Sequence, residues 1–173
     1  MKKHKAKKHA KKHVKKNKGF SLIELLIVVA IILIIAAIAI PNLLRSRIAA
    51  NEASAVGSVR TLNTAEVTYN TTYPTVGFAS LGSLGPVTGG GSATSSAAGL
   101  IDANLASGTK SGYSFVVTPG SGTPVVSYET AASPVTAGTT GQRYFCSDNS
   151  GVIQYNAAAP TGATCASGSN NPI

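Results

Sequence analysis

An unbroken run of sixteen apolar residues, from Leu25 to Ile40, constrains this chain more than any other feature. Extended to residues 20–44, the segment would measure about 37 Å as a helix. That length exceeds the roughly 30 Å hydrocarbon core of a bilayer. The run has no polar stripe, so its whole circumference needs an apolar surrounding. We therefore predict a membrane-spanning helix over residues 20–44.

The segment before this helix, residues 1–19, is strongly basic. It holds ten of the fifteen Lys and Arg residues and all three His residues. Because its like charges repel and it lacks core-forming residues, we expect it to be disordered. It could serve as a nucleic-acid tail, or as a leader that stays cytoplasmic and places the C-terminal body outside.

The rest of the chain is not basic. From Phe20 onward, five basic residues stand against six acidic ones, a net charge of −1. Nucleic-acid binding needs clustered Lys and Arg. We therefore expect no nucleic-acid partner for this body.

Two residues of the apolar segment do not suit a simple anchor. A carboxylate at Glu24 costs a few kcal/mol in lipid unless it is paired, so it suggests a function. Pro41 removes a backbone donor near the far end of the segment. The simpler interpretations are a glutamate at the membrane interface and a proline that ends the helix.

After Pro41 the pattern becomes amphipathic. Apolar residues recur at helical spacing on one face: Ile48, Ala55, Val59, Leu62 and Tyr69. Five polar residues are expected mostly elsewhere: Arg45, Asn51, Glu52, Arg60 and Asn63. The pair Tyr73-Pro74 is the expected end, because a residue before proline avoids helical geometry. A single helix is predicted from near Phe20 to about Thr72, with residues 45–73 as its amphipathic half.

Residues 74–173 are rich in Gly, Ser, Thr, Ala and Pro and are predicted to form a globular head. A short helix is expected over residues 100–106. Four runs have strand character: 113–118, 124–128, 143–146 and 152–155. The stretch 147–151 is typical of a hairpin turn. The predicted fold class is α+β, with an antiparallel sheet of about four strands packed on the amphipathic half of the helix.

The two cysteines are Cys146 and Cys165. Outside the cytoplasm they could form a disulfide, which would close a loop of about 20 residues and contribute roughly 3 kcal/mol. A free pair or a redox pair are the alternatives, although the spacing is not C-x-x-C.

Composition argues against an enzyme. No histidine follows His13, which excludes a His-containing metal site or triad in the body. The six acidic residues are scattered, and no phosphate-binding loop pattern is present. We expect no metal and no cofactor.

The stretch from Lys18 to Glu24, KGFSLIE, resembles the prepilin signature of type IV pilins and of type II secretion pseudopilins. The resemblance implies that a membrane prepilin peptidase cleaves between Gly19 and Phe20 and N-methylates Phe20. It implies a helical homopolymer, assembled by an ATPase through a membrane platform protein. Glu24 would pair with the Phe20 amine of a neighbouring subunit, and Pro41 would let the helix adjust on packing.

The resemblance also implies a location. The precursor would cross the inner membrane once, in contact with lipid and with its head outside, and would then join a cell-surface pilus. The resemblance is to a type IVa-like major pilin: Phe20 and the modest head favour the IVa-like class, and the sequence does not separate a major from a minor subunit. Adhesion, motility, DNA uptake and secretion are not distinguished.

Three alternatives remain at this point. A pseudopilin is less favoured, because the C-terminal tail lacks an acidic cluster for calcium. An ordinary secreted protein could be cleaved after Ala37-Ile38-Ala39. A single-span membrane protein could keep its basic tail.

Overall fold

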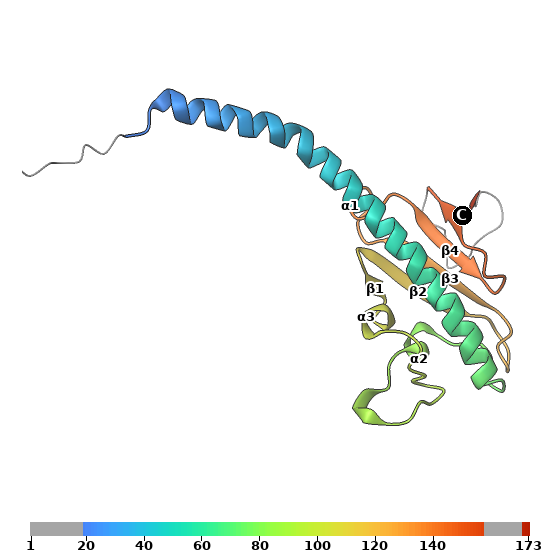
Figure 1. The fold of residues 1–173 in the computed structure, drawn as a ribbon. Helices are drawn as coiled ribbons and strands as arrows, with labels where there is room; N and C mark the ends of the chain where they lie inside the picture. Colours follow the sequence, from blue (N-terminus) through green and yellow to red (C-terminus); the bar gives the residue numbers. More distant parts are fainter. Residues whose placement is uncertain (1–18, 158–170) are drawn as a thin grey trace, which may run out of the picture. The chain divides into compact units, whose positions relative to one another are not determined.

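A computed structural model describes residues 19–157 and 171–173. The chain divides into two compact units, of which the first ends at Ile40 and the second begins at Pro41. Helix α1, Leu22–Thr72, contributes to both units (Figure 1). The predicted single helix from near Phe20 to about Thr72 is therefore confirmed. The expected disorder of the leader concerns residues 1–18, which lie outside the described residues.

The first unit consists of the apolar beginning of α1. Its large apolar side chains are all exposed, from Phe20 at 82% to Val29 at 45%. By length and composition, α1 is the one helix of the described residues that could cross a membrane. A surface of this kind needs lipid or other apolar helices around it.

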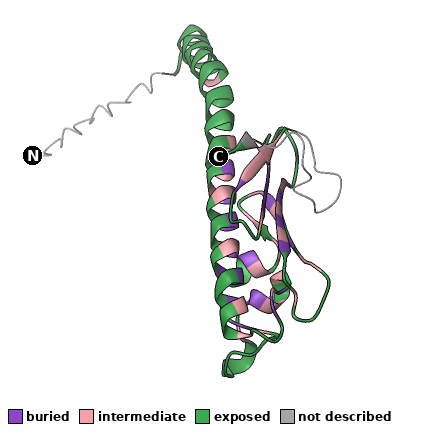
Figure 2. Cartoon of the chain, turned by 90° about the vertical axis from the view of Figure 1, so that its right-hand side faces the viewer, coloured by how far each residue is buried: buried purple, intermediate pink, exposed green. Residues whose placement is uncertain are grey.

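In the second unit, the predicted apolar face of α1 is confirmed. Ala55, Val59, Leu62 and Tyr69 are buried, and Ile48 is half-buried. Figure 2 shows that the buried residues of this part of α1 lie on the side facing the sheet. The apolar period read from the sequence therefore identifies the packing side of the helix.

The expected placement of the polar residues is wrong for Glu52. This residue is buried, as are Ser58 and Glu66 on the same helix. Asn51 and Asn63 are half-buried, and both donate hydrogen bonds to the head. Burial of Glu52 is tolerated because backbone and side-chain donors of Gln142 and Arg143 satisfy its carboxylate.

The described residues form a six-stranded antiparallel sheet in the order β1-β2-β3-β4-β5-β6. Its strands are β1 (Thr109–Lys110), β2 (Tyr113–Pro119), β3 (Tyr128–Pro134), β4 (Tyr144–Asp148), β5 (Gln154–Asn156) and β6 (Asn171–Pro172). The predicted runs 113–118, 143–146 and 152–155 correspond to β2, β4 and β5, whereas the strand β3 was not predicted at its position. The predicted α+β fold is confirmed.

One predicted strand is misplaced. Residues 124–128 lie mostly in the loop before β3, where Val125 forms an isolated bridge with Gly77. The Val125 N–H donates to the Val76 carbonyl at 2.9 Å, and the Phe78 N–H donates to the Val125 carbonyl at 3.1 Å. Gly77 has φ +90°, and an added Cβ would collide with the Val125 backbone. This run therefore ties down the loop after α1 and does not join the sheet.

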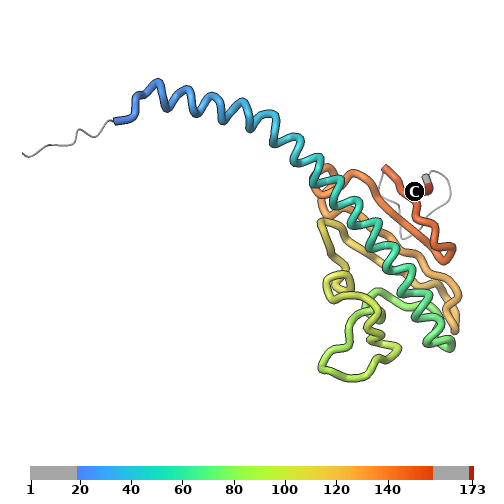
Figure 3. Tube along the Cα trace, in the orientation of Figure 1, coloured from blue at the N-terminus to red at the C-terminus, as the bar shows by residue number. Residues whose placement is uncertain are grey.

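The chain between α1 and β1 is mostly irregular (Figure 3). It contains α2 (Leu81–Leu84), the 3-10 turn η1 (Thr88–Gly90) and α3 (Ala103–Ala106). Helix α3 is shorter than the predicted 100–106, because Asp102 caps its start by accepting from the Leu105 N–H at 3.0 Å. The predicted hairpin turn between β4 and β5 is confirmed, with the Gly151 N–H donating to the Asp148 carbonyl at 2.9 Å.

Cys146 lies on β4 and is buried. Its predicted partner, Cys165, lies outside the described residues. The disulfide between them stays a prediction.

Candidate functional site

The predicted cleavage point lies immediately before α1. Gly19 and Phe20 are not helical, and the helix begins at Leu22. The Leu25 N–H donates to the Ser21 carbonyl at 3.2 Å, which puts Ser21 in the N-cap position. The bond between Gly19 and Phe20 is therefore in exposed, irregular chain that another protein can reach.

Glu24 lies in the first turn of α1 and binds its own chain. Its Oε2 accepts a hydrogen bond from the Ser21 N–H at 3.3 Å. Ser-x-x-Glu is the spacing of a capping box, in which the glutamate satisfies a donor at the helix start. The helix dipole also favours a carboxylate there. The spacing is visible in the sequence, but sequence reasoning missed the role of Ser21.

The structure brings Gly19, Phe20 and Glu24 together at the beginning of α1, but it does not bring Pro41 to them. Pro41 lies inside α1, as the first residue of the second unit. Around Glu24, the side chains of Leu22, Ile23, Leu25 and Leu26 are 59–80% exposed. The carboxylate therefore lies in an apolar surface that a single copy does not cover.

A second group of polar contacts joins α1 to the head through Glu52. Its Oε1 accepts from the N–H groups of Gln142 (2.9 Å) and Arg143 (3.2 Å), and its Oε2 accepts from Arg143 Nε at 2.7 Å. Burial alone would raise the pKa of Glu52, but the hydrogen bonds from Gln142 and Arg143 and the charge of Arg143 outweigh it and lower the pKa. The guanidinium of Arg143 also lies over the rings of Phe145 and Tyr155, at 5.5 and 5.4 Å.

Glu66 is fully buried. Its Oε2 accepts from the Ala79 N–H at 3.0 Å, whereas its Oε1 has no hydrogen-bond partner. Burial outweighs the single hydrogen bond and raises the pKa of Glu66 to about 7. Glu66 thus holds the loop after α1 while remaining incompletely satisfied.

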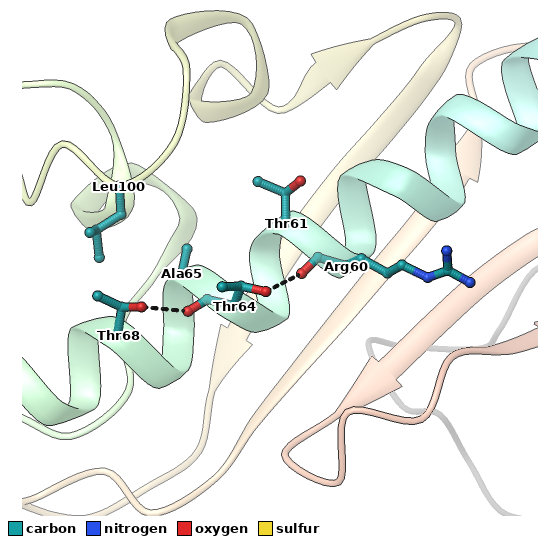
Figure 4. Close-up of a pocket in the computed structure, with 6 residues that line it drawn as sticks. All are labelled: Arg60, Thr61, Thr64, Ala65, Thr68 and Leu100. Atoms are coloured by element: carbon teal, nitrogen blue, oxygen red, sulfur yellow. Dashed lines mark hydrogen bonds between the residues drawn. The ribbon is translucent and has the colours of Figure 1, made fainter.

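The exposed side of α1 carries a hollow of about 310 Å³ (Figure 4). Its lining residues are Arg60, Thr61, Thr64, Ala65, Thr68 and Leu100. The hydroxyls of Thr64 and Thr68 donate to carbonyls one turn earlier, at 3.0 and 2.9 Å. Among the described residues, no group of three or more His, Cys, Asp or Glu side chains could hold a metal ion.

Comparison with known protein families finds a match near the N-terminus of the chain. Residues 14–40 match the prokaryotic N-terminal methylation motif. The chain is 46% identical over 54 residues to the type IV major pilin protein PilA of Myxococcus xanthus, covering 31% of this chain and 24% of that protein. It is 69% identical over 35 residues to the type IV wide pilus major component PilA4 of Thermus thermophilus, covering 20% of this chain and 27% of that protein.

The chain thus spans about a quarter of the length of these relatives. No solved structure matches it. The methylation motif, the homology to type IV major pilins and the α+β fold together support a type IV pilin.

Proposed function

We propose that this chain is the precursor of a type IV pilus subunit that is cleaved between Gly19 and Phe20 and N-methylated at Phe20. The observation that carries the proposal is Glu24, which lies in the first turn of an exposed apolar helix within the methylation motif. The hydrogen bond from the Ser21 N–H caps the helix but does not neutralise the carboxylate, which is costly in an apolar surrounding unless a positive charge pairs with it.

Cleavage would create a positive charge where the assembly needs one. The new amine of Phe20, methylated or not, is an ammonium at neutral pH. Glu24 supplies the opposite charge, and we expect it to pair with the Phe20 ammonium of a neighbouring subunit. In an apolar surrounding, removing one member of such a pair costs about 3–5 kcal/mol, so the pair defines the register of adjacent helices.

Assembly would move the first unit from lipid into a bundle of the same helices. Lipid is as apolar as the helix, so packing and paired polar groups must favour the transfer. Pro41 lacks a backbone donor, which lets α1 lose a helical hydrogen bond at low cost when subunits pack. An assembly ATPase, acting through a membrane platform protein, would supply the work.

The precursor would cross the inner membrane once, and the head would lie outside the cytoplasm. The basic residues 1–18 would hold the N-terminus inside. After assembly, the subunit would be part of a cell-surface pilus.

The test is an intact mass together with N-terminal sequencing of protein sheared from the cell surface. We expect a chain that begins at N-methylated Phe20 and is lighter by two hydrogens for a Cys146–Cys165 disulfide. A chain beginning at Ile40 would indicate ordinary secretion. A full-length chain found only in membranes would also overturn the proposal.

A further inference from the structure

We propose that the exposed face of α1 around Arg60 docks onto the acidic pair Glu129 and Asp148 of a second copy of this chain. The inference rests on the proposed function, because it describes a contact between adjacent subunits of the filament. It concerns the second unit only and adds a contact between heads to the expected helix bundling.

Arg60 is a cation without an ion pair among the described residues. The other basic residues of the head are used: Lys110 binds Asp102 at 2.9 Å, and Arg143 binds Glu52 at 2.7 Å. Arg45 and Arg47 lie close to the apolar segment. Arg45 and Arg47 also form no ion pair among the described residues, so what distinguishes Arg60 is its place on the part of α1 whose other side is buried against the head.

The surface around Arg60 is hollowed on two sides. One hollow, of about 310 Å³, lies toward Leu100. The other, of about 240 Å³, is lined by Arg60 with Val152, Ile153 and Ile173. Because the hydroxyls of Thr61, Thr64 and Thr68 already bond to helix carbonyls, these threonines need no external polar partner. This face of α1 thus offers one charge within a mainly apolar surround.

The complementary surface is the acidic pair. Glu129 and Asp148 are directly opposite each other on β3 and β4. Like charges in such a cross-strand position destabilise a sheet unless a cation compensates them. Among the described residues neither forms an ion pair. Both line a hollow of about 240 Å³, so a long cationic side chain could reach them.

The two surfaces lie on opposite sides of the head. Arg60 is on the exposed side of α1, and the neighbours of Glu129 on β3, Tyr128 and Thr130, are the residues that face the core. Glu129 and Asp148 thus face away from α1, and one copy cannot join the two surfaces. A contact between different patches on opposite sides is head-to-tail, and repetition gives an open filament when the rotation does not close.

The experiment is a charge exchange in the full-length precursor expressed in cells that assemble it. We compare Arg60→Glu, the double variant Glu129→Lys with Asp148→Lys, and all three changes together. The readout is the fraction of subunit recovered in sheared filaments, relative to the total. Because like charges at a contact cost several kcal/mol, we expect each reversal to lower that fraction at least about tenfold.

The combined variant should recover most of the lost filament. In the matched control, Arg47→Glu takes the place of Arg60→Glu in the combined variant. Arg47 is exposed on the same helix and lines neither hollow. That control should not restore assembly of the acidic-pair variant. Normal filaments from the single reversals, or no recovery in the combination, would overturn the docking.

A second measurement does not depend on charge reversal being tolerated. With Arg60→Cys and Asp148→Cys in one chain, a bifunctional thiol cross-linker that spans the length of an extended arginine side chain should give a ladder of covalent oligomers in filaments, while either change alone should not. Absence of a ladder in intact filaments would reject the contact. Absence of sheared filaments from the unaltered chain would instead reject the proposed function.

Discussion

Ser21 and Glu24 are joined by a hydrogen bond of 3.3 Å from the Ser21 N–H to Glu24 Oε2. The carboxylate that we expect to pair between subunits is therefore already occupied within its own chain. One backbone donor satisfies it only in part, because a carboxylate has about four acceptor positions. Glu24 can keep this bond and still accept a neighbouring ammonium.

We expect Glu24→Ala to leave cleavage largely intact and to block assembly. Loss of one member of an ion pair in an apolar surrounding costs about 3–5 kcal/mol, which corresponds to more than about a hundredfold fewer filaments. Immunoblots of sheared and membrane fractions measure both steps. Glu24→Gln is the control, since its amide oxygen keeps an acceptor for Ser21 but carries no charge. It should also fail to assemble, and normal assembly of either variant would exclude the pairing.

Gly19→Arg should leave the leader uncleaved. Gly19 is exposed, and a Cβ added there has no atom of the described residues within 4 Å, so we expect the substitution to leave the fold undisturbed. Any block must then arise where the peptidase holds a small residue at the cleavage point. The migration of the precursor on gels, with an antibody to the head, reports cleavage. Processing at the normal rate would show that the enzyme does not require a small residue there.

The stability of the head should fall as pH rises from about 4.5 to 7, through Glu66. Its pKa is about 7 in the fold and 4.5 in an ordinary environment, so the unfolded chain releases the proton first. The full loss, roughly 3 kcal/mol, is reached above pH 7. Thermal unfolding of the mature chain in detergent, at several pH values, measures it.

Glu66→Gln is the control for this pH effect, because an amide has no proton to release. Its unfolding curve should lose the decline between about pH 4.5 and 7. Glu52 acts in the opposite direction, because its lowered pKa gives stability that is lost as the pH falls below the normal glutamate range. Identical pH profiles for Glu66→Gln and the unaltered chain would show that Glu66 does not titrate in the fold.

Glu52→Ala should lower the free energy of unfolding by about 2–3 kcal/mol, because it leaves the N–H groups of Gln142 and Arg143 without their acceptor. Chemical denaturation of the mature chain provides the measurement. Lys110→Ala removes the other ion pair, which is exposed on both sides, and should have a much smaller effect. Equal effects of the two changes would mean that burial adds nothing at Glu52.

Local patterns in the sequence predicted what depends on neighbouring residues. The apolar run, the helical period and Tyr73-Pro74 located α1 nearly to its last residue. Strand β3 was missed because most of its sequence, YETAASP, consists of residues such as Glu, Ala and Pro that are depleted in strands. Its alternating burial follows from pairing with β2 and β4, which no short window contains.

The residues of the candidate site also differ in how far local sequence could predict them. Gly19, Phe20 and Glu24 form one contiguous motif, so sequence reasoning identified them together. The buried positions of Glu52 and Glu66 depend on donors at 142–143 and 79, which only the folded chain brings to α1. The acidic pair likewise depends on the register of β3 and β4, which the sequence pattern did not predict.

The exposed apolar surface of the first unit has a consequence for how filament length is controlled. In the proposed filament, a subunit with such a helix would have no dissolved state of useful concentration, so it would exchange only between the bilayer and the filament. Filament growth would then depend on the number of subunits per unit area of membrane. A cell could lengthen or shorten its filaments by changing that surface density, without any change in the affinity between subunits.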